Sequence, residues 1–234
     1  MRVGDPALDG SHGPHVIVDN VAQPVLSDRD RRHLTGSLRL RDGDVLTAGD
    51  GRGSWVECVL AGEPRPTGVV HHVPPPDETL GVAFALIKGG RPELVVQKLT
   101  EIGVDEIIVF AAARSVVKWD PSTAIRKIDR LRRVAAEAVM QSRRAWLPTV
   151  NGVMSFGEVA ALPGCAMTDM AGSPMQRVHR TLMVGPEGGW SDSEKENEIP
   201  KVRIAVPVLR AETASIAAGT LLVAMREQLI LPVD

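Results

Sequence analysis

The chain has 234 residues, 44% of them hydrophobic and 24% charged, with a net charge of −2, which is ordinary for a soluble globular protein of one or two domains. No apolar run is long enough for a membrane span, and Met1–Asp5 lacks a secretory-signal pattern, so we expect a cytoplasmic protein with no membrane partner. Cys58 and Cys165 are too few for a disulfide framework or metal cluster and are expected to be buried free thiols. No matching cysteine or acid cluster lies near His71 and His72, so no metal is expected.

Residues 1–73 have the pattern of a small β domain. Short apolar stretches alternate there with turn signals such as Gly49–Gly53, and strands so short and regularly spaced predict a small barrel. The stiff Pro74–Pro76 segment then predicts a domain boundary, with a second domain over 74–234.

The second domain alternates between β and α patterns. Strands are predicted at 80–87, at 106–110, ending at 183–184 and beginning at 203, and helices at 91–103, from 120 to about 146, and from about 213 to 229. Ser191–Glu194 is a capping-box signature that begins a further short helix. Strands separated by helices predict an α/β fold with a mainly parallel sheet covered on both faces.

A polar stripe follows one side of the long predicted helix. At about 100° per residue, one narrow sector holds Arg130, Arg133, Glu137, Gln141 and Arg144. The opposite side is apolar and must face the core. Two interpretations stay open: a solvated face with i,i+4 ion pairs, or a set of arginines that contacts phosphates.

The stretch Gly185–Gly189 (GPEGG) follows an apolar run that ends abruptly. It is either a tight turn or a ligand site at the carboxyl end of a parallel strand, where backbone must approach a ligand closely. No Gly-Lys-Ser/Thr follows it, so it is not a phosphate-binding P-loop, and Glu187 would repel a pyrophosphate. A neutral or cationic ligand fits better.

The segment Leu209–Ser215 joins a predicted strand to the last helix. It places Glu212 at a helix N-terminus, where a carboxylate is favoured, and this could be simple capping. Arg210, at the carboxyl end of the strand, is harder to explain by capping.

Three motifs together resemble the signatures of the RsmE family, the bacterial 16S ribosomal RNA uridine-N3 methyltransferases of the SPOUT class. They are Gly185–Gly189, Leu209–Ala214 and Glu137–Arg144, and Gln97–Val104 and His33 are further points of similarity. The resemblance implies a PUA-like β-barrel over 1–73 and a SPOUT domain over 74–234 with a deep trefoil knot. It also implies bound S-adenosylmethionine, a homodimer, and 16S ribosomal RNA or the small ribosomal subunit as partner.

The resemblance also implies site residues. Those expected to bind the cofactor are Met183, Gly185, Pro186, Glu187, Gly188, Gly189, Ala205, Leu209, Arg210, Ala211, Thr213 and Ala214. Those expected to contact RNA are Arg39, Lys98, Arg114, Arg133, Gln141 and Arg144. Ala205 stands where the family usually has glycine.

For catalysis, we expect Arg210 to stabilise the uridylate and either Glu212 or Glu187 to act as base or orienting acid. Two alternatives remain at this point. The chain could be a noncatalytic RNA-binding factor in ribosome assembly, or a SPOUT enzyme that methylates a ribose hydroxyl or a transfer RNA.

Overall fold

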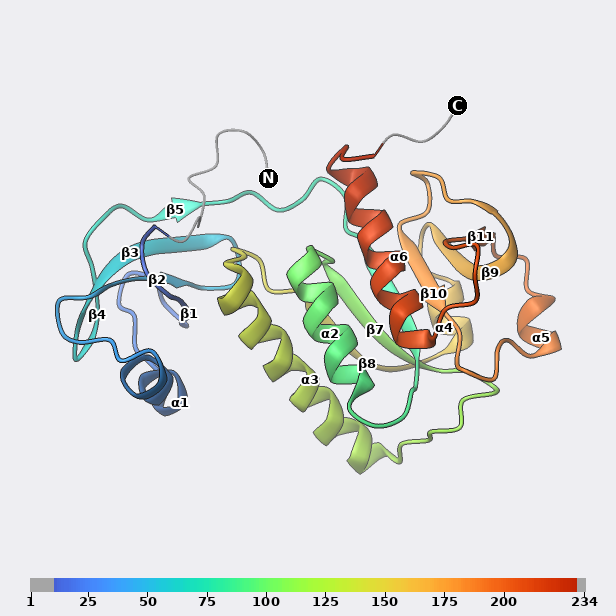
Figure 1. Cartoon of the computed structure of the whole chain (residues 1–234), viewed down its shortest axis with the longest axis horizontal. Coiled ribbons are helices and arrows are strands. Elements are labelled where there is room, and N and C mark those ends of the chain that lie inside the picture. The colour runs from blue at the N-terminus through green and yellow to red at the C-terminus, as the bar shows by residue number, and fades with distance from the viewer. Residues whose placement is uncertain (1–10, 231–234) are drawn as a thin grey trace. The chain divides into compact units, whose positions relative to one another are not determined.

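The computed structural model describes residues 11–230, so the expectation about Met1–Asp5 lies outside the described residues. The chain divides into two compact units (Figure 1), one with residues 11–76 and 136–147, the other with residues 77–135 and 148–230. Helix α3 (Pro121–Ser142) begins in the second unit, and its last residues belong to the first. Over residues 11–230, no helix combines the length and apolarity needed to cross a membrane.

The first unit is built around a five-stranded sheet. Its strands are β1 (His15–Ile17), β2 (Val45–Gly49), β3 (Ser54–Ala61), β4 (Glu63–Pro66) and β5 (His71–His72). The first four lie in the order β1-β2-β3-β4, and β5 pairs with β3. Val56, Cys58 and Leu60 of β3 all enter one core because alternate residues of a strand face the same side.

The expectation of an all-β first domain is wrong between Asp28 and Ser37. Helix α1 (Asp28–Arg32) runs directly into a π-helical turn, η1 (His33–Ser37). The Ser27 hydroxyl caps α1 by accepting a hydrogen bond from the Asp30 N–H at 3.1 Å. The spacing of Ser27 and Asp30 is a helix-start signal, but α1 itself buries no residue, so the apolar period that reveals a helix is missing.

Strand β1 carries a buried histidine. His15 is 4% exposed, its Nδ1 lies 2.9 Å from Thr47 Oγ1, and its Nε2 has no hydrogen-bond partner within residues 11–230. Burial, together with the Arg143 guanidinium, lowers the pKa of His15 to about 4. His15 is therefore neutral in the folded protein at neutral pH.

This burial predicts a loss of stability in mild acid. Between pH 6.5 and 4 the unfolded chain binds a proton at His15 and the folded chain does not, so the free energy of unfolding falls as pH falls. We expect His15 alone to lower it by about 2 kcal/mol between pH 7 and pH 5. Urea unfolding at both pH values measures this, and His15→Gln should reduce the difference. The exposed control His72→Gln should leave this difference unchanged. Equal pH dependence in the two variants would contradict the role of His15.

The second unit contains a six-stranded sheet in the order β11-β9-β10-β6-β7-β8. Its strands are β6 (Gly81–Ala85), β7 (Glu106–Ala111), β8 (Thr149–Ser155), β9 (Cys165–Pro174), β10 (Thr181–Val184) and β11 (Lys201–Arg203). All neighbouring pairs are parallel. This confirms the expected α/β fold with a parallel sheet.

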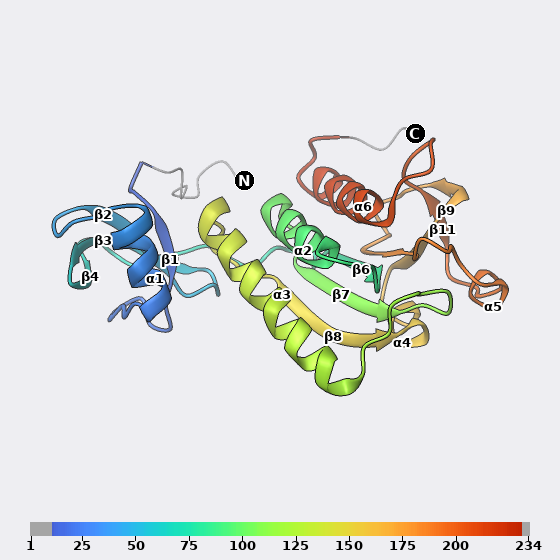
Figure 2. The ribbon, with the colours of Figure 1, turned by 60° about the horizontal axis from the view of Figure 1, so that its bottom comes forward.

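Helices cover both faces of this sheet, and β6 shows how (Figure 2). Val82 and Phe84 belong to one apolar cluster with residues of α2 (Arg91–Ile102), α3 and α6 (Ala211–Arg226). Ala83 and Ala85 belong to another cluster, together with α4 (Phe156–Ala160) and Trp190. The alternation follows from the two-residue period of a strand.

Several predicted boundaries differ from the structure. Helix α3 ends at Ser142, not near residue 146, because Arg143 has φ 56° and leaves the helical region. Strand β11 ends at Arg203, where a strand was expected to begin. Strands β8 and β9 and helix α4 were not predicted, and in β9 the buried residues are the first three and Gly172, so the apolar signal is short.

Both cysteines are buried free thiols, as expected. Burial raises the pKa of Cys58 to about 11 and that of Cys165 to about 12. The thiols therefore stay protonated at neutral pH and are poor nucleophiles.

Candidate functional site

The loop Gly185–Gly189 follows β10 at the carboxyl edge of the parallel sheet, the edge at which such sheets bind ligands. The Gly189 N–H donates to the Pro186 carbonyl at 2.9 Å, and Gly189 has φ 68°, a conformation that favours glycine. A Cβ on Gly185 would lie 2.9 Å from the Trp190 ring, so the backbone rests directly on that indole. The loop therefore exposes backbone on a rigid support.

Trp190 fixes this loop to the sheet. It is 5% exposed, its Nε1–H donates to the Thr168 carbonyl at 2.9 Å, and its ring centroid lies 6.1 Å from that of Phe110. The Thr168 hydroxyl in turn donates to the Met183 carbonyl at 3.0 Å. The Met183 side chain is fully buried and not accessible to a ligand, so of the predicted cofactor contacts it is the backbone of this region that is exposed.

Arg91, the first residue of α2, joins the two glutamates that the sequence singled out. Its Nη1 donates to Glu187 Oε1 at 3.1 Å, and its Nε lies 3.5 Å from Glu212 Oε1. Three segments that are distant in sequence therefore meet at one guanidinium: the start of α2, the loop after β10 and the start of α6. Sequence reasoning treated Arg91 only as the opening of a helix and missed this role.

The two glutamates are not equivalent. The Glu212 side chain is 13% exposed, compared with 35% for Glu187. Glu212 Oε2 is buried and has no hydrogen-bond partner in the part of the chain that the structure describes. A buried acceptor without a partner is costly, so this oxygen is expected to receive a hydrogen bond in a complex.

Residues 204–210 form a second wall, between β11 and α6. Val206 and Val208 are 83% and 84% exposed, and Ala205 and Leu209 are half-buried. Arg210 is exposed, and its side chain has no ion pair or hydrogen bond with residues 11–230. Of the other predicted ligands, Ala211 is buried, Ala214 packs against the core and Thr213 is exposed.

Arg114 lies close to the glycine loop. Its carbonyl oxygen would be 3.2 Å from a Cβ on Gly188, and its Nη2 is 3.9 Å from Asp192 Oδ1 at the start of α5 (Asp192–Lys195). The expected capping box at Ser191 is present, and Glu194 also accepts the Ala113 N–H at 2.8 Å. The capping box thus anchors the segment that carries Arg114.

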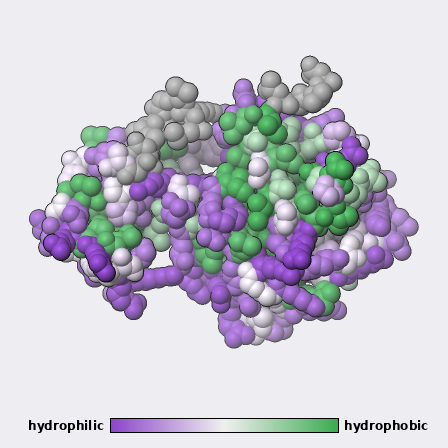
Figure 3. All heavy atoms as spheres, viewed as in Figure 1, coloured by the Kyte–Doolittle hydropathy of each residue, from purple (hydrophilic) through white to green (hydrophobic). Residues whose placement is uncertain are grey.

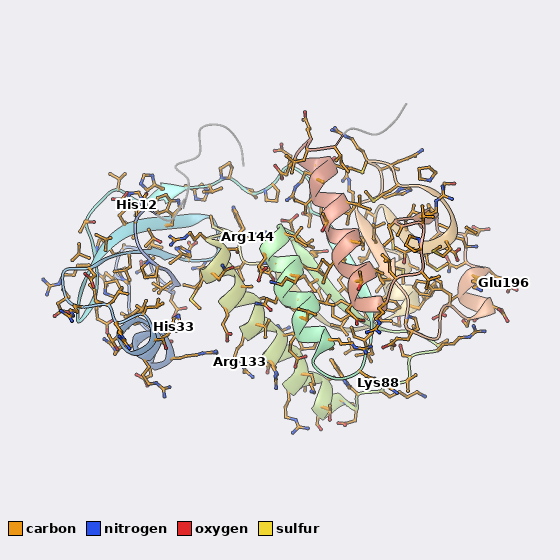
Figure 4. All side chains as sticks on the ribbon, in the orientation of Figure 1. His12, His33, Lys88, Arg133, Arg144 and Glu196 are labelled. Carbon is orange, nitrogen blue, oxygen red and sulfur yellow. The ribbon has the colours of Figure 1, made fainter. Side chains whose placement is uncertain are left out.

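The other predicted RNA contacts are divided between the two units. In the second unit, Lys98 pairs with a neighbour on α2 at 2.7 Å, and Arg133 is exposed on α3 (Figure 4). In the first unit, Arg39 and Gln141 are exposed, and Arg144 is half-buried just beyond the end of α3. These residues therefore form two sets, one in each unit.

Ion pairs occupy part of the polar stripe on α3. Arg130 Nε lies 2.9 Å from Glu93 Oε1, and Glu137 pairs with Arg29. Their partners, Glu93 and Arg29, do not lie on α3, so Arg130 and Glu137 are not paired in the expected i,i+4 manner. Arg133 is exposed and has no ion pair within residues 11–230, so the interpretation that it contacts phosphate stays open.

The chain matches two family models. Residues 74–223 match an RNA methyltransferase domain, and residues 26–70 match an RNA methyltransferase PUA domain. A curated relative, ribosomal RNA small subunit methyltransferase E from Mycobacterium bovis, is 32% identical, and the match covers 86% of each chain. The protein of that name from Bacillus subtilis is 26% identical, covering 82% of this chain and 86% of its own.

Solved structures are similar over at least 90% of the chain. Ribosomal RNA small subunit methyltransferase E from Neisseria gonorrhoeae, bound to S-adenosyl methionine, has 25% identity and a TM-score of 0.75, over 92% of this chain and 98% of its own. A Legionella pneumophila structure with the bound cofactor SAM has 25% identity and a TM-score of 0.76, over 90% of this chain and 96% of its own.

Proposed function

The chain belongs to the ribosomal RNA small subunit methyltransferase E (RsmE) family, and on this premise we propose that it methylates N3 of a uridine in 16S ribosomal RNA. It is an S-adenosylmethionine-dependent ribosomal RNA methyltransferase. The observation that supports the proposed site most strongly is the meeting of Glu187 and Glu212 at Arg91, beside the glycine loop.

The residues at this loop fit S-adenosylmethionine. Its sulfonium is cationic and suits a site with two carboxylates, and its adenine can bind the backbone exposed at Gly185, Gly188 and Gly189. Arg91 neutralises part of the acidic charge, but the unpartnered Oε2 of Glu212 remains as an acceptor. We assign the loop and residues 205–214 as the two walls of the cofactor site.

The same residues suggest how uridine N3 is activated. N3 carries a proton whose pKa is well above neutral, so a base must accept it and a cation must stabilise the charge left on the ring. In our proposal Glu212 accepts the proton at Oε2, and Arg210 stabilises negative charge on the uracil carbonyl oxygens. Glu187, held by Arg91, positions the loop. The bound cofactor supplies the electrophilic methyl group that N3 receives.

Arg91 should be needed for cofactor affinity. In Arg91→Gln the three segments lose their common cation, and we expect S-adenosylmethionine to bind about tenfold more weakly, the effect of losing two partly exposed ion pairs. Isothermal titration calorimetry measures this. Arg132→Gln, which removes an ion pair within α3 and a hydrogen bond to the Val150 carbonyl, is the matched control. Equal affinity in the Arg91 and Arg132 variants would refute the role.

The proposed assembly is a homodimer of chains, each with a PUA-like RNA-binding barrel over 1–73 and a knotted methyltransferase domain over 74–234. Figure 3 shows apolar residues gathered over α2 and α6. On α6, the apolar residues Ile216, Leu221 and Ala224 are half-buried and lie outside the buried face of the helix, which is already in the core. Apolar residues outside the core face of a helix support a partner subunit there. Its ribosomal substrate supports a cytoplasmic location.

Mapping modified nucleosides in 16S ribosomal RNA tests the function and its position together. A strain that lacks the gene should lose one N3-methyluridine, and the wild-type gene should restore it. Loss of a ribose methylation or of a transfer RNA modification would instead identify a different target. An unchanged nucleoside pattern and no calorimetric binding of S-adenosylmethionine would indicate a noncatalytic RNA-binding protein.

A further inference from the structure

A cavity of about 450 Å³ lies in the second unit, outside the site described above. Its walls are the loop Ile87–Gly90 after β6, the first turn of α2, Val117 with Trp119, and the first half of α3. Figure 4 shows Lys88 at the loop that leads into α2. The volume falls within the range of small-molecule sites, about 300–1,000 Å³.

The polar lining of this cavity is mainly cationic. Lys88, Lys127 and Arg130 line it, and Glu93 is the one acid among the described lining residues. Glu93 already pairs with Arg130 at 2.9 Å, whereas Lys88 and Lys127 have no ion pair within residues 11–230. The cavity is therefore suited to an anionic group.

One wall of the cavity is aromatic. Trp119 is half-buried, packs against the main core and also lines the cavity. An indole next to unpaired lysines is the combination with which proteins bind single-stranded RNA, since the ring stacks on a base and the cations bind phosphate.

The backbone at Gly89 and Gly90, on the cavity wall, is accessible to a ligand. Gly89 has φ 71°, and a Cβ on Gly89 or Gly90 would meet nothing within 4 Å. Gly90 is the N-cap of the 12-residue helix α2, and no side chain among residues 11–230 caps that end. Backbone N–H groups at a helix start favour phosphate, so they act in the same direction as the two lysines.

The cavity also adjoins the methyl-transfer site along α2. Arg91 pairs with Glu187 and Glu212, while the next residues, Pro92 and Glu93, line the cavity. One turn of helix therefore borders both sites. A strand whose target base enters the methyl-transfer site has its neighbouring nucleotide within reach of the cavity.

We propose that this cavity binds a nucleotide adjacent to the methylated uridine. Trp119 stacks on its base, and Lys88, Lys127 and the open amides before α2 bind its phosphate. The inference rests on the proposed function, because it requires single-stranded ribosomal RNA as substrate.

Methyl-transfer kinetics on small ribosomal subunits test the phosphate contacts. We expect Lys88→Gln and Lys127→Gln each to lower kcat/KM about tenfold and to reduce the salt dependence of RNA binding by about one charge. S-adenosylmethionine affinity should stay within about twofold, since the cofactor binds elsewhere. Arg126→Gln is the matched control, because Arg126 lies on α3 next to Lys127 and does not line the cavity.

The outcomes separate the two proposals. If the wild-type protein transfers no methyl group to the subunit, the proposed function fails. If the wild type is active and the lysine variants match it, or match Arg126→Gln, the cavity is not an RNA subsite. If the lysine variants instead weaken S-adenosylmethionine binding about tenfold, the cavity holds part of the cofactor, and the inference is overturned.

Stacking on Trp119 requires its own test. Once the target uridine is mapped, RNA fragments with an abasic site on either side of it can be compared as substrates. For the wild type, one abasic position should lower kcat/KM about tenfold, and Trp119→Leu should be insensitive to that position. Trp119→Phe keeps an aromatic ring and should restore the sensitivity. Equal sensitivity in wild type and Trp119→Leu would overturn the stacking role.

Discussion

In Arg210→Ala, kcat for methyl transfer to small ribosomal subunits should fall about 100- to 1,000-fold, the usual effect of removing one group that stabilises charge in a transition state. Arg210 is exposed at the N-cap of α6, and no ion pair within residues 11–230 competes for its guanidinium. It is therefore free to face the uracil carbonyl oxygens as N3 loses its proton. Affinity for S-adenosylmethionine should change little, because the sulfonium of the cofactor is positively charged and gains no attraction from the Arg210 guanidinium.

Single-turnover kinetics, combined with calorimetry of cofactor binding, would check this expectation. Arg203→Ala, which removes an exposed arginine at the end of β11, is the matched control and should keep normal turnover. Arg210→Lys should recover part of the rate. Turnover by Arg210→Ala that equals the control would exclude Arg210 from catalysis.

Glu212→Gln should lower kcat by about 100- to 10,000-fold, the range for loss of a positioned general base. The substitution keeps the shape of the side chain and replaces a proton acceptor with an amide. Glu212 Oε2 is buried and has no partner within residues 11–230, whereas the Glu187 carboxylate is more exposed and pairs with Arg91.

The paired variant Glu187→Gln provides the comparison. It alters the same ion-pair cluster at Arg91, so any effect of weakening that cluster appears in both variants. We expect less than about a tenfold change in kcat for Glu187→Gln. A larger loss for Glu187→Gln than for Glu212→Gln would reverse the two roles.

Local chemistry made part of this structure predictable. Helix α2 ends where Gly103 has φ 111°, and the capping box at Ser191 begins α5, because both signals act over a few residues. The loop Gly185–Gly189 could be placed at a strand end for the same reason, since the buried apolar run Leu182–Val184 before it is the end of β10. Helix α1 was not predicted because it buries no side chain and so has no apolar period.

The arrangement of the site could not be read from such signals. Arg91 meets Glu187 and Glu212 only because β10 lies beside β6 and α6 returns to the same edge. Strand order is decided by the packing of the whole sheet, not by neighbouring residues. The pairing of Arg91 and the cavity beside Trp119 therefore became visible only in three dimensions.

The central position of β10 also has a consequence for how the protein becomes active. Its register pairs Thr181 with Gly81, and Glu212 and Arg210 come later still, at the start of the last helix. Pairing strands so distant in sequence is slow, since a long loop must close before the contacts form. We expect the first unit and the β6–β7 pair to acquire protection from hydrogen exchange before the methyl-transfer site does. A chain still held at its end by the ribosome that made it would then be folded in part and not yet able to methylate a ribosome.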